Sequence, residues 1–185
     1  MSQDNRIRCA WAEATPDYRD YHDNEWGVVL RGDDALFERM SLEAFQSGLS
    51  WLTILRKRAA FRTAFAGFVI ADVAGFDDSS VAGLMADAGI VRNRAKINAT
   101  IGNARVALDL PGGLSELLWS FAPNVAPPSP LTLAEVPPTS AESTAMARGL
   151  KTRGFSFVGP TTCYALMQAS GMVDDHVLGC WRAGR

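Results

Sequence analysis

Cysteine and histidine, the side chains that most often hold zinc, come in one pair near each end of the chain. His176 precedes Cys180 by four positions, so on an α-helix the two would share a face and grip one ion. With Cys9 and His22 they would complete a tetrahedral Cys2His2 shell that leaves no open position for water, which indicates a structural site. The interval from Cys9 to His22 is not a standard zinc-finger spacing, so buried thiols beside unrelated histidines are the alternative. The third cysteine, Cys163, lies in an apolar segment and is expected to be a core thiol.

Aromatic rings stand beside carboxylates in two windows, residues 18–27 and residues 43–51. Stacking on such rings would hold a flat cationic ligand, with about 0.5–2 kcal/mol from each cation–π contact, while Glu43 accepted its hydrogen bonds. An alkylated nucleobase has these properties. The alternative is that Trp26 and Trp51 are core residues and that Glu43 is a helix cap or an ion-pair partner.

The net charge of −2 from 18 basic and 20 acidic residues argues against nucleic-acid binding when it is taken alone. The charges are segregated, however, because residues 1–50 carry 5 basic and 10 acidic side chains and residues 51–110 carry 8 and 5. Three basic stretches, 44–71, 88–108 and 143–173, contain no acid. They could converge on one surface that faces a polyanion, or each could be an ordinary solvated helix face.

Helical spacing dominates the sequence, so we expect a nearly all-α fold. One expected helix carries Glu43 on the same side as Leu36 and Met40, and Asp33 or Asp34 would cap it. Two further helices are expected to pack in the core through residues at helical intervals. These residues are Trp51, Leu55, Arg58, Arg62 and Phe65 in the first helix and Ile97, Ile101, Ala104 and Leu108 in the second. Two short helices are expected over residues 79–87 and 114–121.

A helix–hairpin–helix unit is expected at residues 140–170, after a proline-rich connector near 122–138. Thr139 and Glu142 have the spacing of a capping box, Gly154 suits a helix C-terminus, and Pro160 suits the first turn of the next helix. Such a turn directs unpaired amides and the positive end of a helix dipole outward, where a phosphate can bind. An ordinary αα-hairpin is the alternative.

The 185 residues are 48% apolar and 21% charged, which indicates a folded domain rather than a disordered chain. We expect a single domain over residues 1–185. No stretch is long and apolar enough for a membrane span, and the polar first eight residues do not resemble a secretory signal, so a cytoplasmic location is expected. Three widely spaced cysteines do not form a disulfide framework.

Four motifs occur together in order, and with them the chain resembles the 3-methyladenine DNA glycosylase I family. They are Tyr-His-Asp-Asn-Glu-Trp-Gly at 21–27, Glu-x-x-Gln-x-Gly-Leu-Ser-Trp at 43–51, Gly-Phe-x-Phe-Val-Gly at 154–159 and Asp-His-x-x-x-Cys at 175–180. Shorter matching segments lie at 87–90, 96–97 and 101–105, so the similarity to the family extends from about Cys9 to Cys180. It implies an all-helical helix-hairpin-helix DNA glycosylase fold whose termini are joined by a structural zinc site.

The resemblance also implies roles for individual residues and a reaction. The enzyme would flip N3-methylated adenine out of alkylated double-stranded DNA and hydrolyse its N-glycosidic bond, releasing free 3-methyladenine and leaving an abasic site. It would be a monomer that uses structural Zn²⁺ and no organic cofactor. The expected zinc ligands are Cys9, His22, His176 and Cys180. The expected base-binding residues are Tyr21, Glu43 and Trp51, with Trp11, Tyr18 and Trp26 beside them. The expected DNA-binding residues are Lys151, Arg153, Gly154, Phe155, Gly159 and Thr161.

Two acids are candidate catalytic residues. Glu43 is expected to read the base rather than to activate water. Asp174 stands two residues before His176, where related glycosylases carry a catalytic aspartate, whereas this family more familiarly has asparagine there. Asp174 could assist water or cap a helix that carries His176, and we favour capping. The alternatives to an enzyme are a DNA-binding module that senses alkylated bases and a zinc-stabilised protein-interaction domain.

Overall fold

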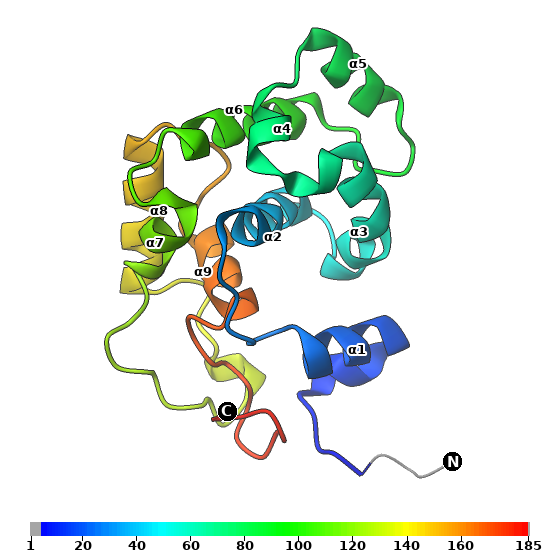
Figure 1. The fold of residues 1–185 in the computed structure, drawn as a ribbon. Coiled ribbons are helices and arrows are strands. Elements are labelled where there is room, and N and C mark those ends of the chain that lie inside the picture. The colour runs from blue at the N-terminus through cyan, green and yellow to red at the C-terminus, as the bar shows by residue number, and fades with distance from the viewer. Residues whose placement is uncertain (1–4, 185) are drawn as a thin grey trace.

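Residues 5–184 are described in the computed structural model, and this part of the chain is helical with no strand (Figure 1). The all-α expectation is therefore confirmed. The α-helices are α1 (Pro16–Asn24), α2 (Asp33–Gln46), α3 (Trp51–Ala64), α4 (Ile70–Ala74), α5 (Asp78–Ala86), α6 (Arg94–Leu108), α7 (Gly113–Trp119), α8 (Ala141–Thr152) and α9 (Pro160–Ala169). The 3-10 helices are η1 (Ala10–Ala14), η2 (Ala66–Phe68) and η3 (Leu133–Glu135).

Helix α2 lies at the centre of the molecule (Figure 1). It packs against α3, α6, α7 and α9, and most of its side chains are buried. Phe37 and Phe45 of α2 meet Phe61, Phe65 and Phe68 in an aromatic core. Burying rings of this size supplies a large part of the hydrophobic stabilisation, so α2 is a rigid element on which a site can be built.

The predicted cap of α2 is wrong, because the N-cap residue is Gly32 and neither neighbouring aspartate caps the helix. Asp34 Oδ1 accepts a hydrogen bond from the backbone N of Ile70 at 2.9 Å, and Asp33 Oδ1 accepts one from the backbone N of Ser115 at 2.8 Å. The two carboxylates therefore attach α4 and α7 to the start of α2.

The predicted core stripe of α3 is only partly right. Phe65 is buried as expected, but Ile54 and Phe61 supply the rest of the buried face. Arg58 and Arg62 form ion pairs with acids of the first 50 residues instead. Helical periodicity predicts which residues share a side, but the side that enters the core depends on what packs against it.

The α8–α9 hairpin lies where the sequence predicts it. Its capping box is formed by Ser140 and Ser143, one residue later than the predicted Thr139 pair. Helix α8 ends before Gly154, whose φ of 97° is a conformation that glycine adopts without strain, and α9 begins at Pro160.

The C-terminal segment after α9 lies against both the connector and the N-terminal segment. The backbone N of Leu178 donates to Pro130 O, and that of Trp181 donates to Ile7 O, both at 2.8 Å. In the connector only η3 is helical, and residues 170–184 contain no helix. The prediction of a helix that carries His176 and Cys180 is therefore wrong.

No helix within residues 5–184 is long and apolar enough to cross a membrane.

Candidate functional site

A cavity of about 420 Å³ opens between η1, α1, α2, α3 and α9. All the residues expected at a base pocket line it, namely Trp11, Tyr18, Tyr21, Trp26, Glu43 and Trp51. Gln46, which belongs to the predicted window 43–51, lines it as well. The other lining residues were missed by the sequence reasoning and are Leu133, Val136, Ala165, Gln168 and Asp175. The space between the rings and the acid is thus open. Trp26 and Trp51 are half-buried and line it, and Trp51 also packs against the hydrophobic core.

The rings of the cavity support one another through edge contacts. The Trp11 ring meets the Tyr18 ring at 5.6 Å between centroids and the Trp26 ring at 5.2 Å, both nearly perpendicular. Tyr21 and Trp51 lie 5.4 Å apart with their planes inclined by 46°. Edge-to-face packing fixes the orientation of each ring, so these aromatic faces are preorganised for a flat ligand.

Glu43 is one of two acids at the wall of the cavity, with Asp175, and is only 5% exposed. Burial raises the pKa of Glu43 to about 7, although the positive charge of Arg39, one turn earlier on α2, lowers it. No side chain within residues 5–184 donates a hydrogen bond to this carboxyl. Because a buried carboxylate without donors is costly, a ligand that brings hydrogen-bond donors would stabilise the ionised form.

Arg39 holds Tyr21 in place at the same wall. Its Nη1 donates to the Tyr21 hydroxyl at 3.0 Å, and its Nη2 donates to Glu25 at 3.3 Å. Arg58 completes the network with a hydrogen bond of 2.6 Å to Glu25. Since a guanidinium only donates, the Tyr21 hydroxyl accepts from Arg39 and its own proton is available to another acceptor. Burial raises the pKa of Tyr21, so the hydroxyl stays protonated at neutral pH.

Asp175, in the segment that follows α9, also lines the cavity. Its Oδ2 accepts hydrogen bonds from the Tyr164 hydroxyl at 2.8 Å and from Gln168 Nε2 at 2.7 Å. Asp175 and Gln46 both lie inside the quoted motifs, so a signal for them existed. Leu133 and Val136 had none, because only the folding of the connector brings them to the cavity.

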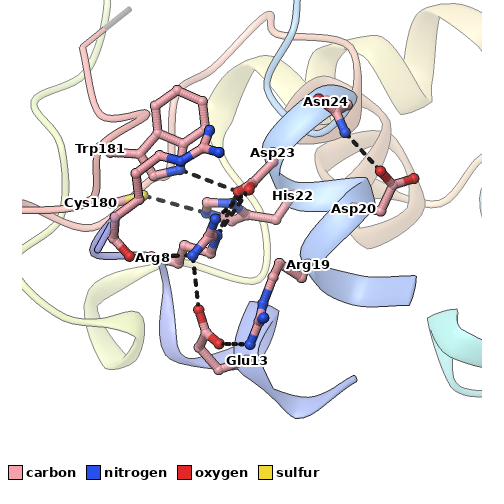
Figure 2. Close-up of polar contacts among 10 residues, drawn as sticks. Arg8, Glu13, Arg19, Asp20, His22, Asp23, Asn24, Cys180 and Trp181 are labelled. Carbon is pink, nitrogen blue, oxygen red and sulfur yellow. Dashed lines mark hydrogen bonds and ion pairs between the residues drawn. The ribbon is translucent and has the colours of Figure 1, made fainter. Parts of the chain in front are cut away.

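Three of the four predicted metal ligands meet where the N-terminal segment packs against the segment that follows α9. Ligand atoms of Cys9, His22 and Cys180 all lie within 4.8 Å of one another, and all three residues are buried. Cys180 Sγ is 3.4 Å from His22 Nε2 (Figure 2). Zinc bonds of about 2.0–2.3 Å in a tetrahedron place neighbouring ligand atoms about 3.5 Å apart, so the spacing fits this ion.

His176 lies beside this group but is not one of its three members. Its ring centroid is 5.0 Å from that of His22, and its Nε2 is buried without a hydrogen-bond partner within the described chain. A buried ring nitrogen without a partner is what a fourth ligand position requires.

Carboxylates orient both histidines. Asp23 Oδ1 lies 2.9 Å from His22 Nδ1, and Asp23 itself accepts hydrogen bonds from Arg8 and Trp181 (Figure 2). Burial opposes ionisation of Asp23, but these hydrogen bonds outweigh it and lower its pKa. Metal-bound histidines commonly donate their second nitrogen to a carboxylate in this way. The surroundings of His22 therefore also fit a metal centre.

Asp174 is not among the residues that line the cavity. Its Oδ1 lies 2.7 Å from His176 Nδ1 and accepts from the His176 backbone N at 3.1 Å, while Oδ2 accepts from the Gly184 backbone N at 2.6 Å. The favoured role as a helix cap is wrong, because no helix begins here. The side chain instead fixes the His176 ring and the C-terminal turn.

The hairpin presents part of the expected DNA-binding set to solvent. Lys151, Arg153, Gly154 and Thr161 are exposed and Gly159 is half-buried. The Phe155 side chain is buried in the core, so this residue can contact DNA only through its backbone. Phe157 is exposed at the turn and was missed, although it lies inside the quoted motif.

The three acid-free stretches do not form one free cationic surface. Arg56, Arg58 and Arg62 of the first stretch pair with acids of the first 50 residues. In the second, Lys96 and Arg105 donate to backbone carbonyls. Within these stretches, the exposed basic residues for which residues 5–184 offer no ion-pair partner are Arg92, Arg94, Arg105, Arg148, Lys151 and Arg153. Arg153, like Arg105, donates a hydrogen bond to a backbone carbonyl.

Comparisons with known proteins agree with this geometry. The family model described as methyladenine glycosylase matches residues 11–183. The chain is 45% identical over 179 residues to DNA-3-methyladenine glycosylase 1 of Escherichia coli, covering 94% of this chain and 95% of the relative. It is 40% identical over 177 residues to DNA-3-methyladenine glycosylase of Haemophilus influenzae, covering 94% and 96%.

Solved structures show the same fold. A crystal structure of 3-methyladenine DNA glycosylase I superposes with a TM-score of 0.91 at 40% identity over 96% of this chain and 100% of that one. A structure that describes 3-methyladenine recognition by the Staphylococcus aureus protein superposes with a TM-score of 0.90 at 32% identity, covering 96% and 97%. The chain therefore belongs to the methyladenine glycosylase family of enzymes.

Proposed function

We propose that this enzyme removes 3-methyladenine from alkylated double-stranded DNA and leaves an abasic site. The observation that carries the proposal is the open cavity that Glu43 lines together with the rings of Tyr21 and Trp51. The names of the relatives, which are 40–45% identical over nearly the whole chain, support the same substrate.

The proposed base-binding set is Tyr21, Glu43 and Trp51, with Trp11, Tyr18 and Trp26 completing the wall. Methylation at N3 makes the base cationic, so the aromatic faces attract it and the Glu43 carboxylate accepts hydrogen bonds from its amino group. The cation also favours the ionised form of Glu43, whose pKa of about 7 leaves much of it protonated when the cavity is empty. A neutral adenine lacks this charge and binds more weakly.

The bond that breaks joins the sugar C1′ to N9 of the base. Its electron pair moves to the base, which leaves as neutral 3-methyladenine, so the enzyme need not protonate it. The oxygen of a water molecule then bonds to C1′ and loses a proton to solvent. Glu43 is proposed to read the base, while DNA phosphates beside the sugar stabilise the positive charge that develops there. Asp174 lies outside the cavity and engages His176, so we assign it no part in this step.

The α8–α9 unit is proposed to act as the helix-hairpin-helix element that holds the DNA backbone. No side chain of residues 5–184 caps the N-terminus of α9, so its first amides are available to a phosphate beside Gly159 and Thr161. Lys151 and Arg153 would add charge at the same turn, together with the backbone at Gly154 and Phe155. These contacts hold the duplex without reading bases while the damaged base leaves the stack.

A structural Zn²⁺ held by Cys9, His22, His176 and Cys180 is proposed to join the two ends of the chain. Zinc would neutralise the thiolates and tie the N-terminal segment to the C-terminal one. The unpaired Nε2 of His176 and the carboxylate behind each histidine support this assignment.

The test is to incubate the protein with duplex DNA treated with a methylating agent and to identify any released base by chromatography and mass spectrometry. Release of 3-methyladenine with accumulation of abasic sites is expected. Retention of the DNA without release would indicate a sensor of alkylated bases, and neither binding nor release would indicate a protein-interaction domain. Either result would refute the proposed reaction.

A further inference from the structure

The side chain of Asn103, on α6, is bonded at both ends of its amide to one residue of the α8–α9 turn. Its Nδ2 donates to the Ser156 backbone O at 3.0 Å, and its Oδ1 accepts from the Ser156 backbone N at 2.8 Å. Asn103 is only 3% exposed, so water competes little for these bonds. Figure 1 shows the turn between α8 and α9 next to α6. The short sequence match to the family at 101–105 thus includes a residue that lies outside the base cavity and contacts the hairpin turn.

The turn at Ser156 has little else to hold it. The backbone N of Phe155 donates to Leu150 O at 3.1 Å, and that of Cys163 donates to Gly159 O at 2.8 Å, which ties down the two sides of the turn. In the described chain no backbone–backbone hydrogen bond reaches Ser156 or the residue after it. Asn103 therefore supplies the hydrogen bonds that fix the tip.

Phe157, the residue after Ser156, shows that the tip is held in an unfavourable conformation. Its φ is 57°, which is uncommon for a residue with a side chain, and the residue is 40% exposed. Such a conformation persists when the surrounding structure imposes it, and strained residues are concentrated at functional sites. The neighbouring Phe155 and Val158 are buried, so they anchor the two sides of the turn while Phe157 faces solvent.

We propose that Asn103 is a positioning residue for DNA binding, which fixes the Ser156–Phe157 tip so that its backbone and the Phe157 ring meet the DNA backbone in a preset conformation. The inference rests on the proposed function of the hairpin and adds to it a residue on another helix. A tip that is already ordered pays less entropy on binding than a flexible one. Asn103 lines no part of the base cavity, so its effect on the base itself should be small.

The test compares Asn103→Ala, which removes both hydrogen bonds, with Asn103→Asp, which keeps the acceptor for the Ser156 amide but turns a carboxylate oxygen toward the Ser156 carbonyl. Asn98→Ala is the matched control, because Asn98 lies on the same helix and is exposed. The affinity for a duplex with a reduced abasic site is measured by fluorescence anisotropy. Affinity for free 3-methyladenine is measured by tryptophan fluorescence, and single-turnover base release is measured at saturating DNA.

Ordering two residues of a freed tip should weaken DNA binding by about 10-fold or more in Asn103→Ala. Affinity for free 3-methyladenine and release at saturating DNA should stay within about twofold of wild type, and Asn98→Ala should match wild type throughout. Unchanged DNA affinity in both Asn103 variants would overturn the proposal, as would an equal loss of affinity for the free base.

A further variant decides the question if Asn103→Ala does not fold. Phe157→Gly should fold, because glycine adopts a φ of 57° without strain, but it loses the ring and loosens the tip. It should weaken DNA binding while base affinity is kept, and unchanged DNA affinity in Phe157→Gly would contradict a role for the tip. Failure of the proposed function is separate, since it would show as wild-type protein that releases no 3-methyladenine.

Discussion

Replacing Glu43 with glutamine should stabilise the protein and weaken its hold on the base. Burial raises the pKa of Glu43 from 4.5 to about 7 in the folded chain, so folding opposes its ionisation. Below pH 4.5 the carboxyl is protonated in both states and carries no penalty. As the pH rises from 4.5 to 7, the unfolded chain ionises while the folded chain stays largely protonated, so stability falls by about 3 kcal/mol and then levels off.

Glu43→Gln removes this pH dependence because an amide does not ionise. The free energy of unfolding of the variant minus that of wild type should therefore rise by about 3 kcal/mol between pH 4.5 and pH 8. Urea unfolding at a series of pH values measures it. The matched control is Glu38→Gln on the same helix, where a partly exposed ion pair with Arg62 is worth only about 0–1 kcal/mol.

The same variant should bind free 3-methyladenine about 5–30-fold more weakly, because a charge-assisted hydrogen bond is replaced by a neutral one that is about 1–2 kcal/mol weaker. Base release from methylated DNA should fall as well. A stability difference that does not change with pH would refute the buried, ionisable Glu43. Full release together with undiminished affinity for the free base would refute its role in reading the base.

Three other changes test the surroundings of the cavity. Cys180→Ser should lower the bound zinc, measured by elemental analysis, and lower the melting temperature of protein purified with zinc, whereas an equal zinc content would contradict the metal centre. Asp174→Asn should reduce thermal stability but leave the single-turnover release rate within a few fold of wild type, and a loss of 100-fold or more would instead indicate catalysis. Lys96→Met should cost about 2–4 kcal/mol in urea unfolding, because it removes charged hydrogen bonds to Phe45 O at 2.9 Å and Ser47 O at 2.6 Å. It should also weaken base affinity, since the freed loop joins Gln46 to Trp51, and an unchanged affinity would show that Lys96 does not position that loop.

Local signals in the sequence determined most of the helices and the α8–α9 hairpin. Gly154 and Pro160 mark the two sides of the turn because their backbone preferences act within a few residues, whatever packs around them. The rings and Glu43 were also recognisable from their types and from the motifs around them. These features depend on side-chain chemistry and on neighbours along the chain, which a sequence shows directly.

Only the tertiary structure decided which groups are free and which are already engaged. Arg58 looked available as a cation but is paired with Glu25, and Asp174 looked like a cap but holds His176. Leu133 reaches the cavity although nothing in the connector's sequence marks it. The physical reason is that charge pairing, burial and hydrogen-bond satisfaction depend on atoms that come together from distant parts of the chain, and these distances exist only after the helices have packed.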